Sequence, residues 1–291
     1  EGFHAADLEL LSARSIAPED DASATEDARR VGRVDGGFGA VVAWLGRDLG
    51  ASLRLRSPVR AIRWRPGFVE VTTRGAPILR ARTAIVTVPV GVLVRPASAG
   101  GIRFEPEPAR VRAALTGFAM GSVVRVTFAF AHDPWERIAH GGARRLSFVQ
   151  LFGDSFQVAW TAYPRRAPLV VLWCGGPRAG ALARDGRAAV LATARRELAH
   201  ALRTSPTALR SSLRGAWWHD WDRDPCARGA YAYARVGGED ASRRLARPEE
   251  DTLFFAGEAT DPEGGTVDAA LASGWRAARQ VRSRLHGART R

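Results

Sequence analysis

Apolar residues recur along this chain at two different spacings, and the two spacings predict both helices and strands. Helical spacing is clearest in residues 184–203, whose apolar face consists of Leu191, Ala194, Leu198, Ala201 and Leu202. The same spacing follows the break at Gly36-Gly37 in "RVDGGFGAVVAWLGRDLG", and Gly50 supplies a stop signal for that helix. A further helix is predicted over residues 109–115, after a proline-rich turn.

Shorter apolar runs, bounded by Gly and Pro, predict strands. The first group spans residues 53–88, starts where Leu53 and Leu55 alternate with arginines, and has the pattern of a meander. Its last run, "AIVTVPV", is almost entirely apolar, as expected for a strand covered on both faces. Further strands are predicted in "GSVVRVTFAF", "LSFVQLF", "FQVAWTAY" and "LVVLWCGG". Because strands and helices interleave, the fold class is α/β or mixed α+β.

The C-terminal stretch "LFFAGEATDPEGGTVDAALASGWRAARQV" predicts a strand, an acidic turn, a glycine break and an amphipathic helix. Gly257-Glu258 follow the strand, and Gly264-Gly265-Thr266 precede the helix. Glycines at these points are typical of close backbone approach to a ligand, and equally of ordinary strand–turn–helix connections. The residues by themselves leave both interpretations open.

Composition narrows the class of protein. The 291 residues are 46% hydrophobic, enough for one large domain or two intertwined domains. The net charge is +13, and every one of the 43 basic residues is Arg. These arginines are scattered rather than gathered in one block, so we expect no specific nucleic-acid binding. The absence of Lys excludes an internal Schiff base to pyridoxal phosphate and a phosphate-loop Lys.

Two cysteines and six histidines are present, and none has Cys-x-x-Cys or His-x-x-x-His spacing. The sequence therefore predicts neither a metal site nor a disulfide framework. Apolar runs such as residues 83–94 are too short for a membrane span, and no signal segment is evident. A cytoplasmic protein is the default expectation.

Three further stretches share an order and spacing with a known family. They are "GGFGAVVAWLGRDLGASLRLRSPVRAIRW" with the returning "TAIVTVPVGVL", then "MGSVVRVTFAFAHDPWE", then "WDRDPCARGAYAYARVG" followed by the C-terminal stretch. Together they resemble the flavin amine oxidases, which include monoamine, polyamine and L-amino-acid oxidases and the amine-oxidase-type histone demethylases. The resemblance implies a two-domain fold: a partial FAD-binding domain in residues 31–92 and 206–291, and a mixed-sheet substrate domain in residues 93–205. Residues 1–30 would be a remnant of substrate-domain helices.

The resemblance implies a role for several residues around FAD. The backbone at Val59 would meet the adenine, and Gly257 with Glu258 would lie by the ribityl and diphosphate portion. The helix N-terminus at Gly265, Thr266 and Val267 would face the pyrimidine edge of the ring, where its dipole stabilises negative charge. Each of these positions also has an ordinary interpretation. Val59 could be a plain strand residue, Glu258 a turn acid, and residues 265–267 an ordinary helix cap.

Aromatic and basic positions complete the implied site. Trp221 matches an aromatic beside the flavin and Tyr231 a residue lining the substrate cage, although either could be a core aromatic. The second cage position falls at Thr266, so a paired tyrosine cage is absent and Tyr233 is expected to be structural. Arg125 stands where the family commonly has a Lys that holds a water near the flavin; it is either a tolerated variant or a sign of an altered reaction.

Two further departures concern the cofactor. Covalent monoamine oxidases attach the flavin through a cysteine at the position of Ala230, and Cys226 lies four residues too early. We therefore predict noncovalent FAD. The family's Gly-x-Gly-x-x-Gly phosphate-binding motif is missing, so the chain resembles the C-terminal part of such an enzyme and is expected to bind FAD poorly by itself.

The resemblance implies an FAD-dependent oxidoreductase that oxidises a small amine or amino acid, with O2 as acceptor. One alternative keeps the fold but desaturates carotenoids or oxidises porphyrinogens, which the substitution at Arg125 would fit. Another is a noncatalytic remnant that has lost FAD binding.

Overall fold

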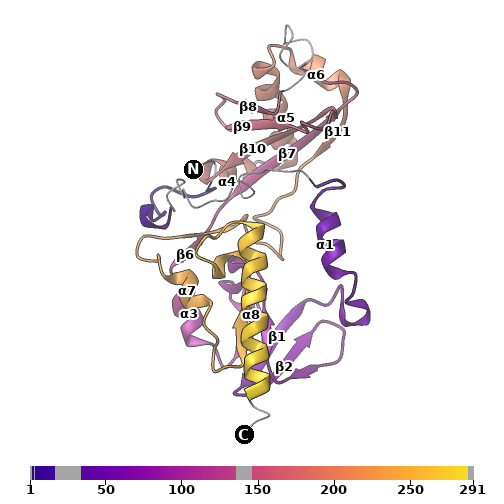
Figure 1. The fold of residues 1–291 in the computed structure, drawn as a ribbon. Coiled ribbons are helices and arrows are strands. Elements are labelled where there is room, and N and C mark those ends of the chain that lie inside the picture. Colours follow the sequence, from indigo (N-terminus) through magenta and orange to yellow (C-terminus); the bar gives the residue numbers. More distant parts are fainter. Residues whose placement is uncertain (1, 3, 17–33, 136–145, 288–291) are drawn as a thin grey trace.

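The computed structural model describes residues 2, 4–16, 34–135 and 146–287. Buried side chains in this part of the chain form two large hydrophobic cores. Figure 1 shows one body, with the five-stranded sheet and α5 and α6, above a second body that contains β1, β2, α3, α7 and α8. The mixed α and β fold class predicted from the sequence is confirmed.

The upper sheet has the strand order β11–β7–β10–β9–β8. Its strands are β7 (Val123–Phe130), β8 (Phe148–Gln150), β9 (Val158–Thr161), β10 (Leu169–Gly175) and β11 (Leu213–Trp217). Every pairing is antiparallel, so the expectation of a mixed sheet here is wrong. Strands β8, β9 and β10 follow one another as hairpins, and a hairpin forces opposite directions.

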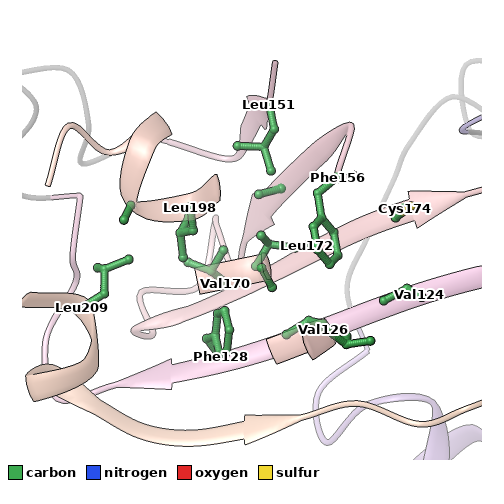
Figure 2. Close-up of a cluster of buried hydrophobic side chains, with 14 of the residues drawn as sticks. Val124, Val126, Phe128, Leu151, Phe156, Val170, Leu172, Cys174, Leu198 and Leu209 are labelled. Carbon is green, nitrogen blue, oxygen red and sulfur yellow. The ribbon is translucent and has the colours of Figure 1, made fainter. Parts of the chain in front are cut away.

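One face of this sheet is covered by three helices, α4 (Pro177–Arg184), α5 (Gly186–Ala201) and α6 (Pro206–Ser212). Alternate residues of β7, namely Val124, Val126 and Phe128, point into the core with Leu172 and Leu198 (Figure 2). This period of two is the alternation expected for a half-buried strand.

The lower body contains three smaller sheets. A four-stranded sheet, ordered β3–β2–β1–β5, consists of β1 (Val59–Arg65), β2 (Phe68–Thr73), β3 (Leu79–Ala81) and β5 (Arg103–Glu105). Two strand pairs accompany it: parallel β4 (Ala84–Val86) and β13 (Leu253–Phe255), and antiparallel β6 (Phe118–Met120) and β12 (Ala232–Ala234). The helices around them are α2 (Val90–Leu93), α3 (Ala109–Leu115), α7 (Ala241–Leu245) and α8 (Val267–Gly287).

Helix α1 (Phe38–Gly46) stands at the side of the molecule in Figure 1. It begins after Gly37, whose φ of 76° suits glycine, but none of its residues is buried. The remaining turns are the 3-10 helices η1 (Ala13–Ser15), η3 (Gly50–Ser52), η4 (Ala97–Ala99) and η6 (Glu258–Thr260). In the described part of the chain, every helix is too short or too polar to cross a bilayer.

Two strand predictions need correction. The alternation of Leu53 and Leu55 with arginines forms no strand, since both leucines are exposed in an irregular segment before β1. The "AIVTVPV" run does form β4, but it is covered on one face only: Val86 is buried while Ile85 is 41% exposed. A two-stranded parallel pair offers too little surface to cover both faces.

The two cores do not divide at the predicted domain boundaries. Strand β5 pairs with β1, and Phe104, Val111 and Phe118 belong to the lower core. Helix α6 and β11 belong instead to the upper sheet and its core. The chain therefore passes from the lower core to the upper core near residue 121 and returns after residue 218. The assignment of the lower core to an FAD-binding domain and of the upper core to a substrate domain stays a prediction.

Residues 4–16 run along both bodies rather than forming helices of the substrate domain, apart from the single turn η1. The carbonyl of Ala5 accepts the Ser122 N–H at 3.3 Å, and Leu11 forms an isolated bridge with Arg235. Buried Tyr233 uses its hydroxyl to accept the Asp7 N–H at 3.3 Å, which fits the structural role predicted for it. Residues 17–33 lie outside the described part of the chain.

Candidate functional site

The parallel strands β4 and β13 end side by side, and a cavity of about 220 Å³ opens at their carboxyl ends. Its lining comes from the segment after β4, residues 87–90, and from the turn after β13, residues 256–260. In α/β proteins ligands bind in the crevice outside the carboxyl ends of parallel strands. The topology therefore places Gly257 and Glu258, singled out from the sequence, at the edge where a ligand is expected.

Gly257 has a backbone that requires glycine. Its φ of 133° and ψ of 166° fall in a region that residues with a Cβ rarely adopt. Its N–H donates to Ser273 Oγ on α8 at 2.8 Å, and that hydroxyl donates in turn to the Ala270 carbonyl at 2.7 Å. The turn after β13 is thus fixed to α8 by a buried serine.

Glu258 is held between two segments that are far apart in sequence. Its carboxylate accepts the Ala232 N–H at 3.1 Å and the Gly265 N–H at 2.9 Å. Burial raises the pKa of Glu258 above its ordinary value, although the two N–H donors act in the opposite direction. Each carboxylate oxygen has a second lone pair, so the group can still accept hydrogen bonds from a ligand.

Tyr231 lies beside this carboxylate. A Cβ on Gly265 would come within 3.6 Å of the Tyr231 ring, so ring and glycine are in near contact. Burial, with the negative charge of Glu258 as a second cause, raises the pKa of the Tyr231 phenol to about 12. The structure therefore brings together Tyr231, Glu258 and Gly265 from the predicted set.

The N-terminus of α8 is formed as the sequence predicts. Thr266 Oγ1 accepts the Ala269 N–H at 3.0 Å, the geometry of an N-cap, and Val267 is the first helical residue. Gly264 and Gly265, with φ of 38° and 63°, make the left-handed turn that leads into this cap. A capped and exposed helix start of this kind can stabilise a negative charge that lies close to its free N–H groups.

Arg276 was not singled out from the sequence, yet it holds the site together. Its guanidinium donates to the carbonyls of Ala246 and Phe255 at 3.0 Å each, and to Thr260 Oγ1 at 2.7 Å. Burial lowers its pKa from the ordinary value. Ser273 and Arg276 are polar residues on the inner side of an amphipathic helix, and that pattern is the sequence signal that they have partners there.

Three predicted residues lie elsewhere. Val59 starts β1 and packs against the lower core, and it is not among the residues that line the cavity. Trp221 is exposed and meets the His219 ring edge-on, with ring centroids 4.4 Å apart; His219 Nε2 lies 2.7 Å from Asp224 Oδ2. Their roles around FAD stay predictions.

Arg125 is the third predicted site residue that lies away from the cavity. It lies on β7, on the face of the upper sheet opposite α4, α5 and α6, where its side chain is exposed and partial desolvation by its neighbours lowers its pKa. The start of β7 is joined to the site all the same: the Gly121 N–H donates to the Tyr231 carbonyl, and the Ala230 N–H donates to the Gly121 carbonyl, at 2.8 Å each. Arg125 is therefore the third residue of β7 and lies four residues after Gly121, which contacts Tyr231.

Comparison with known proteins decides the family. The sequence profile of "Flavin containing amine oxidoreductase" matches residues 1–282. The chain belongs to the flavin-containing amine oxidoreductase family. Polyamine oxidase 2 of Arabidopsis thaliana is 29% identical over 289 residues, covering 98% of this chain and 54% of that protein. Lysine-specific histone demethylase 2 of Homo sapiens is 25% identical over 264 residues, covering 84% and 29%.

Solved structures agree on the fold of this flavin amine oxidoreductase. Putrescine oxidase bound to putrescine superposes with a TM-score of 0.71 at 22% identity, covering 85% of this chain and 53% of that one. The chain thus spans about half the length of polyamine oxidase 2 and putrescine oxidase. The family resemblance inferred from the three sequence stretches is confirmed.

The residues of this family member fit part of FAD. A glycine that admits close approach and a carboxylate with spare acceptor capacity line one cavity, and the capped helix start is joined to that carboxylate through the Gly265 N–H. A polyhydroxy chain joined to an electron-poor ring would need these three features. These residues do not include the family's binding loop for the FAD phosphates, because the 291 residues contain no Gly-x-Gly-x-x-Gly.

Proposed function

We propose that this chain carries the ribityl and ring side of the site in an FAD-dependent enzyme that oxidises an amine or an amino acid, with O2 as acceptor. The observation that carries the proposal is the meeting of Tyr231, Glu258 and Gly265 at the carboxyl ends of β4 and β13, in a chain of this family. When bound, FAD supplies the acceptor for a hydride from the carbon that bears the amino group.

The chain's own groups bind and orient in this proposal. Glu258 accepts hydrogen bonds from hydroxyl groups of the cofactor, and Gly257 lets that part approach the backbone. The start of α8 at Thr266 faces the electron-poor edge of the ring and stabilises charge there. Tyr231, whose phenol is neutral near pH 7, offers the substrate an aromatic face and a hydrogen-bond donor. The backbone at Val59 contacts the adenine, and Trp221 packs beside the flavin ring.

The proposal places the phosphate-binding loop on a separate βαβ segment that packs against exposed apolar surface of this chain. Strand β4 pairs with β13 alone among the described strands, and Ile85 projects from its uncovered face. Val267, Leu271 and Trp275 form an exposed apolar stripe at helical spacing on α8, with Trp275 69% exposed. A βαβ segment would add a strand to β4 and cover both surfaces, and the relatives' additional length is enough to supply it.

The test compares residues 1–291 alone with a longer polypeptide that joins them to a Gly-x-Gly-x-x-Gly segment. We expect flavin fluorescence titration to show weak FAD binding by residues 1–291 and tight binding by the longer protein. Acid denaturation should release the flavin, since Ala230 stands where a covalent link would form. Flavin that stayed attached would contradict noncovalent binding.

Activity is measured on the longer protein with a panel of amines and amino acids. Anaerobic loss of flavin absorbance, followed by hydrogen peroxide release in air, is the expected result. Tight FAD binding without reduction by any member of the panel would favour a desaturase or porphyrinogen oxidase. Failure of the longer protein to bind FAD would refute the proposal and favour a noncatalytic remnant.

A further inference from the structure

The face of the upper sheet that turns away from α4, α5 and α6 is unusually aromatic. An antiparallel sheet with one face on the core commonly presents polar side chains on the other. Here four aromatic residues lie on that second face: Phe148, Trp160, Trp173 and Trp217. Trp217 and Phe148 are 56% and 55% exposed, so they do not belong to either core. An exposed aromatic patch of this kind marks a binding surface.

Strand register places these side chains in two adjacent rows. One row runs Trp217, Thr127, Val171, Trp160 and Phe148 across the five strands. The next runs Arg125, Trp173, Val158 and Gln150. Directly opposite residues on antiparallel strands have Cβ atoms about 4.5–5.5 Å apart, so Arg125 and Trp173 are immediate neighbours. Within these two rows, Arg125 is the one charged residue, and it lies beside the aromatic side chains.

Two contacts fix the orientation of the central aromatic side chains, Trp160 and Trp173. The Trp160 and Trp173 rings lie 6.1 Å apart at 40°, and Trp173 Nε1 donates to the Gly2 carbonyl at 2.9 Å. Arg125 has no such partner: among the residues that the structure describes, no carboxylate or carbonyl accepts from its guanidinium. Its side chain is exposed on the sheet, and partial desolvation by its neighbours lowers its pKa, so the guanidinium is accessible to an anionic ligand.

We propose that this surface binds the substrate, with an aryl or other apolar group on Trp160 and Trp173 and a carboxylate on Arg125. The inference rests on the proposed function and narrows it to an aromatic amino acid or a similar aryl-bearing acid. A guanidinium fork matches the two oxygens of a carboxylate, whereas it repels the second ammonium of a polyamine. The polyamine and putrescine oxidases that this chain resembles are named for cationic substrates, so Arg125 would separate this chain from them.

The test uses two ligands of nearly equal size and opposite charge, 3-(4-fluorophenyl)propionate and 3-(4-fluorophenyl)propylamine, observed by fluorine NMR with residues 1–291. We expect the acid to bind about tenfold more tightly than the amine, the scale of one charge-assisted hydrogen-bonded pair. Arg125→Gln should abolish this preference, and Arg125→Lys should retain part of it because the charge remains. Arg210→Gln changes an exposed arginine on α6, on the far side of the sheet, and should leave both affinities unchanged.

Trp160→Leu is the second variant; it should weaken both ligands equally, since it removes the shared aryl contact. Equal affinities for acid and amine in the unmodified chain would overturn the inference, as would a preference that survives Arg125→Gln in protein with an unchanged circular dichroism spectrum. Flavin reduction in the longer protein separates the two proposals. Reduction by amines without an acid preference refutes only the substrate class, whereas acid binding through Arg125 without any reduction refutes only the oxidase.

Discussion

Arg276 is the residue whose loss should disturb the candidate site most without touching the cavity. Its guanidinium joins α8 to three separate elements, through the carbonyls of Ala246 and Phe255 and the hydroxyl of Thr260. Thr260 Oγ1 donates in turn to the Gly257 carbonyl at 2.9 Å, so the contacts reach the turn that carries Glu258. Replacement by Met keeps the apolar stem of the side chain and removes these hydrogen bonds, together with a fourth to Gln280 Oε1 on α8 at 3.1 Å.

The expected loss in the free energy of unfolding follows from the number of hydrogen bonds that the substitution removes. A hydrogen bond contributes about 1 kcal/mol net, and one to a charged group about 1.5–3 kcal/mol. We use the lower value because the guanidinium is only partly buried and water replaces part of what is lost. Four bonds then give a loss of about 4 kcal/mol in the free energy of unfolding. For a chain of 291 residues this loss lowers Tm by roughly 6 °C.

The assay is urea unfolding followed by tryptophan fluorescence, with the midpoint and slope fitted separately. Arg279→Met is the matched control, because Arg279 lies three residues further along α8, is exposed, and makes no hydrogen bond within the described residues. We expect a clear drop in the midpoint for Arg276→Met and almost none for Arg279→Met. If the two variants unfold within about 1 kcal/mol of each other, the reasoning from the hydrogen bonds is wrong.

Three other changes test the site and its supports. Glu258→Gln should reduce the pH dependence of stability: burial raises the carboxyl pKa in the folded state, so the native protein should lose stability as pH rises from 4.5 through that raised pKa, and urea midpoints over this range should fall less steeply in the variant than in the unmodified chain. Gly257→Ala should destabilise by about 1–3 kcal/mol through backbone strain, whereas Gly274→Ala, at an open helical position on α8, should stabilise by about 0.5–1 kcal/mol; thermal melts that ranked them the other way would refute the assignment of strain. Tyr231 should ionise at about pH 12 in an ultraviolet titration, and Tyr231→Phe should remove that step, so a Tyr231 signal near the ordinary value of 10.0 would contradict the burial of the phenol beside Glu258.

Local elements followed from the sequence where one physical pattern dominated. The helix within residues 184–203 has a strong apolar face, and it forms as α5 after Gly186, whose φ of 84° separates it from α4. The helix over residues 109–115 and the four strands of the "GSVVRVTFAF" to "LVVLWCGG" segment also form. The strand predicted at Leu53 and Leu55 does not form, because alternation alone does not supply a partner strand.

The candidate site was predictable in part. Glycines that need unusual backbone angles leave a local signature, and Gly257 and Gly265 were found by it. Arg276 and Ser273 were missed because their importance lies in which distant carbonyl or N–H they meet, and one sequence does not give that pairing. The aromatic face was hidden for the same reason, since its members come from four strands.

The sequence by itself determined the family, the helices and most strands, and the strand–turn–helix with its glycines, since each depends on residues close together in the chain or on motif order. Only the tertiary structure decided that Ala232 and Gly265 donate to the same carboxylate, that Arg125 stands opposite Trp173, and that β4 and α8 leave apolar surface uncovered. The Glu258 contacts span 7 and 26 positions along the chain, and the Arg125–Trp173 pair joins β7 to β10. Their energies depend on burial and register, which local propensity does not specify.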